Sequence, residues 1–117
     1  MTSDSNCLFC KIVNKEIPAS FEYEDETVVA FKDIKPEAPI HILIIPRRHL
    51  SGLNDLDTGS AELMSKLMLA AKDIAANKGL RDSGYRLIIN CGRDAGQAVE
   101  HIHVHLLGGR PMNWPPG

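Results

Sequence analysis

The chain has 117 residues, of which 44% are hydrophobic and 24% are charged, and its formal net charge at pH 7 is −2. This length fits one domain, residues 1–117, and the composition is that of a soluble globular protein, which excludes intrinsic disorder. The small net charge excludes the broad basic field that holds a nucleic-acid backbone, so we expect no nucleic-acid partner. An anionic ligand must instead be bound by local groups in a pocket.

The cysteines and the apolar segments exclude two further classes of protein. Three cysteines, an odd number that includes the pair Cys7 and Cys10, do not resemble the disulfide framework of a secreted domain. Residues 1–6 lack the basic and apolar regions of a secretory signal and are expected to be a flexible N-terminus. The stretch from Ile40 to Pro46 is too short to cross a bilayer. We therefore expect a cytoplasmic protein with no membrane partner.

The N-terminal part of the chain predicts a short helix and three strands. Asn6 is expected to cap a helix from about Cys7 to Asn14, and Pro18 ends any helical run. The residues from Phe21 to Lys32 follow a β pattern on both sides of an acidic turn, which predicts a hairpin. A loop with two prolines then leads to a buried strand from Ile40 to Ile45.

The remainder of the chain predicts one long helix and two strands. Apolar residues at helical spacing from Leu63 to Ala75 predict an amphipathic helix, and Gly79 supplies its C-terminal stop. Strands are expected from Tyr85 to Asn90 and from Val99 to Leu107, followed by an irregular tail, residues 110–117. Strands on either side of a single long helix predict an α+β domain with a mainly antiparallel sheet.

Three of the five histidines stand at alternate positions, His101, His103 and His105. Alternate residues of a strand share a face, so these imidazoles are expected to line one face while the apolar residues between them pack behind. An exposed polar strand would more naturally use threonine, lysine or glutamate. The pattern therefore indicates a chemical role.

Two chemistries fit this pattern. The three histidines can chelate zinc, because imidazole nitrogen is a ligand of that metal. Alternatively, one histidine is a nucleophile, and its neighbours orient it and supply a proton. The glycine-rich turn from Gly92 to Gly96 favours the second, because its backbone N–H groups can cradle a phosphate.

The segment from Gly96 to Gly117 resembles the C-terminus of the Hint branch of the histidine triad (HIT) family, the purine nucleoside phosphoramidases. The family motif is His-φ-His-φ-His-φ-φ, where φ is apolar, and His101 to Leu107 matches it at every position. Four upstream segments also resemble Hint segments in the same order: Lys15–Pro18, Ala30–Ile34, Ala38–His41 and Ile45–His49. The resemblance extends from about Cys7 to the last residue.

The resemblance implies a fold, an assembly and a ligand class. The family fold is a five-stranded antiparallel sheet with one long and one short helix. Two subunits of the family join into a homodimer with a continuous ten-stranded sheet. The expected ligands are purine nucleotides, namely AMP, GMP or their phosphoramidate derivatives.

The resemblance also implies a two-step hydrolysis. His103 corresponds to the family nucleophile, which attacks the α-phosphorus of a nucleoside 5′-phosphoramidate such as adenosine 5′-monophosphoramidate. An amine leaves, and water then releases the nucleoside monophosphate from the nucleotidyl-histidine. His105 is expected to contact the phosphate or protonate the leaving group, and His41 to support the hydrogen-bond network. Neutral imidazole is a good nucleophile if its other ring nitrogen donates to a fixed acceptor, for which the His101 carbonyl is the expected group.

The nucleotide-binding residues follow by position in the resemblance. Asp33 corresponds to the carboxylate that accepts hydrogen bonds from the ribose, and Asn90 and Gln97 to contacts on the phosphate side. The residues that correspond to the base-binding apolar set are Leu8, Phe9, Ile12, Ile17, Phe31 and Ile34. Without the resemblance, Asp33 reads as a turn residue and the apolar set as ordinary core. Ala98 departs from the pattern, since many Hint proteins have a serine there that contacts the phosphate or the leaving group.

Cys7-Leu-Phe-Cys10 resembles the zinc-binding segment of other HIT members. There the two thiolates bind zinc with two histidines, which correspond to His49 and His101 here. Two cysteines and two histidines make a closed tetrahedral set, so the expected zinc is structural. The alternative is that both cysteines are small buried residues of a helix.

Two other functions compete with the phosphoramidase. The first is a zinc hydrolase that uses His101, His103 and His105 as catalytic ligands. The second is a nucleotide-binding protein without catalysis, to which the alanine at position 98 lends support. Among HIT-type enzymes, another nucleotidyl hydrolase is the alternative that the resemblance leaves open.

Overall fold

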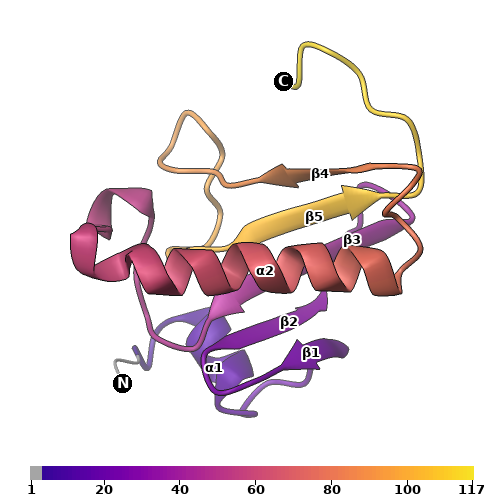
Figure 1. Ribbon diagram of the computed structural model, residues 1–117. Helices are drawn as coiled ribbons and strands as arrows, with labels where there is room; N and C mark the ends of the chain where they lie inside the picture. Colours follow the sequence, from indigo (N-terminus) through magenta and orange to yellow (C-terminus); the bar gives the residue numbers. More distant parts are fainter. Residues whose placement is uncertain (1–3) are drawn as a thin grey trace.

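The structure is a computed structural model that describes residues 4–117 (Figure 1). The predicted flexible N-terminus, residues 1–6, therefore lies partly outside the described residues. Residues 4–6 form a turn in which the Cys7 backbone N–H donates to the Asp4 carbonyl at 3.0 Å.

Five strands form one antiparallel sheet, as predicted. In chain order they are β1 (Phe21–Glu24), β2 (Val28–Lys32), β3 (Ile40–Pro46), β4 (Tyr85–Ile88) and β5 (Val104–Gly108). Their order across the sheet is β1-β2-β3-β5-β4, and every neighbouring pair is antiparallel. The sheet brings β5 beside β3, far from it in the sequence, and leaves β4 at an edge.

Two helices accompany the sheet, a short one, α1 (Leu8–Val13), and a long one, α2 (Ala61–Asn77). Two 3₁₀ turns, Leu53–Asp55 and Thr58–Ser60, lead into α2. The predicted stop is present, because Gly79 has φ +77° and the Leu80 N–H donates to the Ala75 carbonyl at 2.9 Å. Glycine adopts this left-handed conformation without strain, so it ends the helix cleanly. No helix between residues 4 and 117 has the length and apolarity that crossing a membrane requires.

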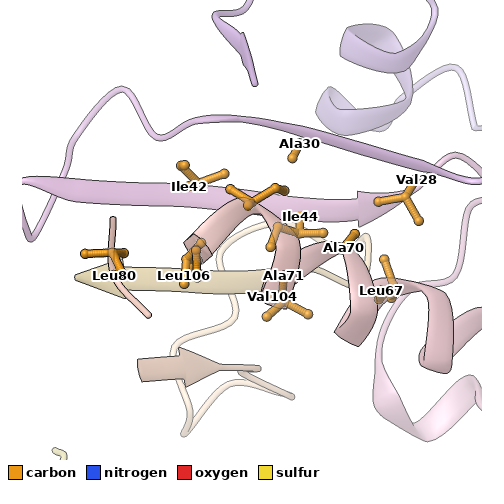
Figure 2. Close-up of a cluster of buried hydrophobic side chains, with 12 residues drawn as sticks. Val28, Ala30, Ile42, Ile44, Leu67, Ala70, Ala71, Leu80, Val104 and Leu106 are labelled. Atoms are coloured by element: carbon orange, nitrogen blue, oxygen red, sulfur yellow. The ribbon is translucent and has the colours of Figure 1, made fainter. Parts of the chain in front are cut away.

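The helix α2 lies across one face of the sheet and buries a core that is entirely hydrocarbon (Figures 1 and 2). Every second residue of β2, β3 and β5 points to this face, as the period of a strand requires. The core consists of Val28, Ala30, Ile42, Ile44, Leu67, Ala70, Ala71, Ile74, Ala75, Leu80, Val104 and Leu106.

The opposite face of the same strands packs against α1. Its apolar cluster consists of Cys7, Phe9, Cys10, Ile12, Val13, Val29, Phe31, Leu43 and Ile45. Six residues of helix cover less of the sheet than the 17 residues of α2 do. The α1 face therefore leaves room for a ligand cavity.

Three predicted boundaries are wrong. The cap of α1 is Cys7, not Asn6, because the Cys7 Sγ accepts the Cys10 N–H at 3.4 Å. The strand predicted from Tyr85 to Asn90 ends at Ile88, and the strand predicted from Val99 to Leu107 runs from Val104 to Gly108.

The late start of β5 has a physical cause. Its pairing with β3 begins at Val104 opposite Ile44, and β3 ends at Pro46, which has no N–H to extend the ladder. The Ile102 N–H instead donates to the Leu50 carbonyl. Of the three histidines only His105 therefore lies in a strand, and the predicted strand is wrong for His101 and His103. His103 and His105 still lie on the same side, with ring centroids 5.0 Å apart, whereas His101 does not share their cavity.

Candidate active site

A cavity of about 300 Å³ lies between α1 and the sheet. Ten of the predicted nucleotide-site residues line it: Leu8, Phe9, Ile12, Ile17, Phe31, Asp33, Ile34, Ala98, His103 and His105. Five further residues line it that the sequence did not single out: Pro18, Ala19, Lys32, Leu43 and Val99. Leu43 pairs with Phe31 across β2 and β3, so both side chains point to the same face of the sheet. A hairpin-like register between these two predicted strands would have identified Leu43 as a lining residue.

His103 lines this cavity, and one of its ring nitrogens is already hydrogen-bonded within the protein. Its Nδ1 donates to the His101 carbonyl at 2.7 Å, which leaves the lone pair on Nε2. The edge of the Phe9 ring packs against the imidazole, with centroids 5.1 Å apart and planes at 88°. Burial is the main cause that lowers the pKa of His103 below its ordinary value, so the ring is neutral at pH 7. This is the protonation state that a histidine nucleophile requires.

His105 and His41 form a hydrogen-bonded pair with a defined direction. The backbone N–H of Glu37 donates to His41 Nδ1 at 3.0 Å, so a neutral His41 carries its proton on Nε2. That Nε2 lies 2.9 Å from His105 Nδ1 and donates to it. Burial, followed by the nearness of His103 and His41, lowers the pKa of His105 to about 4. A neutral His105 therefore carries a proton on Nε2.

Asp33 lines the cavity and follows directly after β2. Its carboxylate accepts the Lys35 N–H at 2.8 Å, and its second oxygen lies 3.4 Å from His41 Nε2. These contacts fix the orientation of a carboxylate that still has lone pairs for further donors. Ribose hydroxyls are donors of this kind.

A second cluster joins α1 to the segment before β5. Cys7, Cys10, His49 and His101 present four ligand atoms that lie within 4.8 Å of one another. Cys7 Sγ lies 3.4 Å from His101 Nδ1, and Cys10 Sγ lies 3.4 Å from His49 Nδ1 and 3.6 Å from His101 Nδ1.

These distances fit a tetrahedral zinc ion. Zinc–sulfur and zinc–nitrogen bonds at tetrahedral angles place a sulfur and a nitrogen ligand about 3.5 Å apart. The outer contacts also fit, because His101 Nε2 donates to the Pro46 carbonyl at 2.8 Å and so presents Nδ1 to the two sulfurs. On the other side of the cluster, His49 Nε2 lies 4.0 Å from the Asp4 carboxylate.

The cluster also bears on the alternative of a three-histidine zinc centre. Within residues 4–117, His103 belongs to neither group of side chains with metal-ligand geometry, and its Nδ1 is bonded to a carbonyl. The second such group consists of Asp33, His41 and His105, whose 2.9 Å histidine contact is the hydrogen bond described above. The arrangement of His101, His103 and His105 therefore does not favour metal chelation by all three.

The sequence model of the family described as "HIT domain" matches residues 14–112. The chain belongs to the HIT domain family. It is 53% identical to the "14 kDa zinc-binding protein" of Zea mays, over 97% of this chain and 90% of that protein. It is 48% identical to "Adenylylsulfatase HINT1" of Arabidopsis thaliana, over 98% of this chain and 79% of that protein.

Solved structures of HIT proteins share the fold. A HIT family hydrolase from Legionella pneumophila Philadelphia 1 superposes with a TM-score of 0.95 at 51% identity, covering 96% of this chain and all of the other. A histidine triad nucleotide-binding protein from Candida albicans gives a TM-score of 0.82 at 32% identity, with coverage of 94% and 83%. The predicted HIT fold is therefore confirmed.

Two predicted phosphate contacts of this HIT protein lie outside the cavity lining, Asn90 and Gln97. The Gln97 side chain is used within the protein, since its Oε1 accepts the Gly92 N–H at 3.0 Å and its Nε2 donates to the Ser51 and Val99 carbonyls at 2.6 and 3.1 Å. Gln97 thus holds the loop that carries Ala98 at the cavity, and its contact with a phosphate stays a prediction.

Proposed function

We propose that this HIT protein is a nucleotide-binding hydrolase that cleaves purine nucleoside 5′-phosphoramidates through a nucleotidyl-histidine on His103. One observation carries the proposal. The neutral imidazole of His103 lines the cavity while its Nδ1 is bonded to the His101 carbonyl, so the lone pair of Nε2 is free to attack phosphorus. The names of the relatives, a hydrolase and a nucleotide-binding protein, support the same class.

In the first step, His103 Nε2 attacks the α-phosphorus and the P–N bond breaks. The positive charge that develops on the imidazole is stabilised by the hydrogen bond from Nδ1 to the His101 carbonyl. In the second step, water attacks the nucleotidyl-histidine, which releases AMP or GMP and restores the neutral ring.

His105 is the proposed proton donor. Its Nε2–H neighbours His103, with ring centroids 5.0 Å apart, and it contacts a phosphoryl oxygen or protonates the leaving amine. His41 holds this tautomer through the 2.9 Å bond and so acts as a positioning residue. His101 acts through its carbonyl.

The nucleoside binds in the apolar part of the cavity. Side chains of α1, β2 and the loop after it enclose the base, and the Asp33 carboxylate accepts the ribose hydroxyls. Ala98 also lines the cavity, and it lacks the hydroxyl that many Hint proteins have there.

We also propose a structural zinc ion held by Cys7, Cys10, His49 and His101. The geometry fits, and the maize relative is named a zinc-binding protein. Zinc would cross-link α1 to the segment that carries the nucleophile. The reduced thiols of such a site support a cytoplasmic location.

We further propose that residues 1–117 form a single domain with a C-terminal tail at 110–117, and that two such chains form a homodimer. The edge strand β4 exposes 38% of Tyr85 and 37% of Leu87, and Trp114 of the tail is 81% exposed. An edge with this apolar surface suits a two-fold partner. Light scattering at micromolar concentration should give about twice the 12.9 kDa chain mass, and a clean monomer would contradict it.

The test is His103→Ala, assayed on adenosine 5′-monophosphoramidate and by calorimetry with AMP. Turnover should fall at least about a thousandfold while AMP affinity stays within a few-fold, because the nucleophile is lost and the cavity remains. Glu100→Gln, an exposed change in the same segment, is the control. A variant that keeps more than a few per cent of the activity would contradict the covalent route.

The same assay separates the rival functions. Turnover that survives a chelator favours the histidine nucleophile over a zinc hydrolase. AMP binding by the wild type without turnover of any substrate would indicate a non-catalytic binding protein. The substrate panel should include adenylyl sulfate, because the Arabidopsis relative is named an adenylylsulfatase.

A further inference from the structure

We propose that Cys7 and Cys10 form a redox modification site at which peroxide expels the bound zinc and loosens the nucleophile His103. The proposal rests on the zinc site proposed above and not on the identity of the substrate. It follows from three features: access to one of the two sulfurs, the closeness of the other, and the contacts that join both to His103.

Access is the first feature. A second cavity, of about 400 Å³, lies beside α1 and is lined by Cys7, His49, Ser51 and Glu100 among others. Cys10 does not line it and is 1% exposed, whereas Cys7 is 8% exposed. Cys10 Sγ also accepts the Asp4 backbone N–H at 3.4 Å. A small oxidant therefore reaches Cys7 first.

The closeness of the second sulfur is the next feature. The Sγ atoms of Cys7 and Cys10 lie within 4.8 Å of each other, one turn apart at the start of α1. A sulfenic acid on Cys7 therefore has a resolving thiolate beside it, which is the arrangement found at reversible redox sites. Cys91 is not part of this cluster.

The chemistry balances with hydrogen peroxide as the oxidant. The Cys7 thiolate attacks one peroxide oxygen, the O–O bond breaks, and hydroxide leaves and takes a proton to form water. The Cys10 thiolate then attacks the Cys7 sulfur, the S–OH bond breaks, and the second hydroxide leaves as water after taking a proton. The two thiolates lose two electrons in total and the peroxide gains two, so zinc keeps its charge and loses two of its four ligands.

The shortest polar route from the sulfurs to the active site passes through His101. His101 faces both sulfurs with Nδ1, at 3.4 and 3.6 Å, and its carbonyl is the acceptor that orients His103 at 2.7 Å. With zinc gone, the His101 ring loses its bond to the metal and keeps the hydrogen bond from Nε2 to the Pro46 carbonyl and its packing against Phe9. Oxidation should therefore lower turnover by weakening the orientation of His103.

The experiment uses the zinc-loaded 117-residue chain with Cys91→Ser, in which Cys7 and Cys10 are the two cysteines left to form a disulfide within a chain. Treatment with a few equivalents of hydrogen peroxide should release about one zinc per chain, seen with a colorimetric chelator. The intact mass of the zinc-free chain should fall by two hydrogens, and the melting temperature should drop by several degrees. Dithiothreitol and zinc should reverse all three changes.

Two comparisons locate the attack and its effect. Cys10→Ser should be labelled by a sulfenic-acid probe at Cys7, whereas Cys7→Ser should stay unlabelled at the shielded Cys10. Turnover of oxidised Cys91→Ser protein should fall at least fivefold with the Michaelis constant little changed. If the untreated protein turns over no substrate, the proposed function fails. The ring NMR signals of His103 then replace turnover as the measure of how firmly its imidazole is oriented.

Three results would overturn the proposal. One is zinc retained and thiols unmodified under peroxide that oxidises a free thiol control. Another is zinc loss with two oxygens added to one cysteine and no disulfide. The third is a disulfide that leaves both turnover and the His103 ring signals unchanged, which would break the proposed link through His101.

Discussion

The two faces of the sheet are built from the same strands and differ in almost every other respect. On one face the 17-residue α2 covers a hydrocarbon core in which Val28, Ile44 and Val104 are fully buried. On the other face the six-residue α1 leaves a cavity, and two buried histidines, His101 and His103, lie beside it.

This difference shows how one alternating sequence supplies both stability and a reactive site. Residues pointing to α2 contribute burial free energy and carry no chemistry. Residues that point to α1 are packed less completely, because this face also holds the cavity. The imidazoles on this face are desolvated and held in fixed tautomers. Neighbouring residues of one strand should therefore differ in what their truncation impairs: stability on the α2 face, and ligand binding or catalysis on the α1 face.

The adjacent residues Ile44 and Leu43 of β3 test this most strongly. Ile44→Ala leaves a void beneath α2 and should lower the free energy of unfolding by about 2–5 kcal/mol while the folded fraction keeps its turnover. Leu43→Ala borders the existing cavity and should cost less stability but raise the Michaelis constant. Urea unfolding and steady-state kinetics measure both. Equal destabilisation with unchanged kinetics would contradict the division between the faces.

Removal of the metal ligands should weaken the α1 face alone. Cys7→Ser/Cys10→Ser should lose about one zinc per chain and melt several degrees lower, because the site cross-links α1 to the segment before β5. Turnover should fall only partly, through the slackened His101. Metal analysis, melting and kinetics check this, with Cys91→Ser as the control. A double variant that keeps its melting temperature and loses all turnover would point instead to a catalytic metal.

Protonation should also destabilise the α1 face selectively. His105 has a folded pKa of about 4, against about 6.5 when unfolded. Between these values the unfolded chain takes up a proton that the folded chain does not, so stability falls as the pH drops from about 6.5 to 4. His105→Asn retains an acceptor for His41 and should show a shallower fall in urea titrations with zinc present. Identical slopes in both proteins would refute this assignment.

The smallest expected effect concerns the missing hydroxyl at position 98. Ala98→Ser should raise kcat by up to about tenfold, since one added donor to the phosphate or leaving group contributes on the order of 1 kcal/mol. Ala95→Ser, on the exposed turn nearby, should change nothing. A decrease in kcat for Ala98→Ser would mean that this position favours a leaving group that needs the space.

The strands and helices were predictable because their signals are local. The helical spacing before Gly79 and the β patterns of the hairpin and of β3 each reflect one periodicity, and the structure confirms these elements. The ends of β4 and β5 were not predictable, because they depend on partners. Pro46 ends the ladder that Val99 to His103 would otherwise extend, and no local pattern near the histidines shows this.

The candidate site also has a part that the sequence predicted and a part that it did not. The His-x-His spacing and the cysteine pair pointed to two clusters that the structure brings together, although His101 and His103 precede the strand. Sequence alone did not identify Lys32 and Val99 as cavity-lining residues, nor the hydrogen bonds that Gln97 donates within the protein. Both depend on how segments that are distant in the sequence meet in the fold.

The most direct test of the central claim is to trap the intermediate. Wild-type protein mixed with adenosine 5′-monophosphoramidate and quenched in base within its first turnover should carry one adenylyl group, because the phosphoramidate bond to histidine survives base better than acid. Peptide mass spectrometry should place that group on His103. An adenylyl group on His105, or full turnover without any labelled histidine, would contradict the assignment of His103 as the nucleophile.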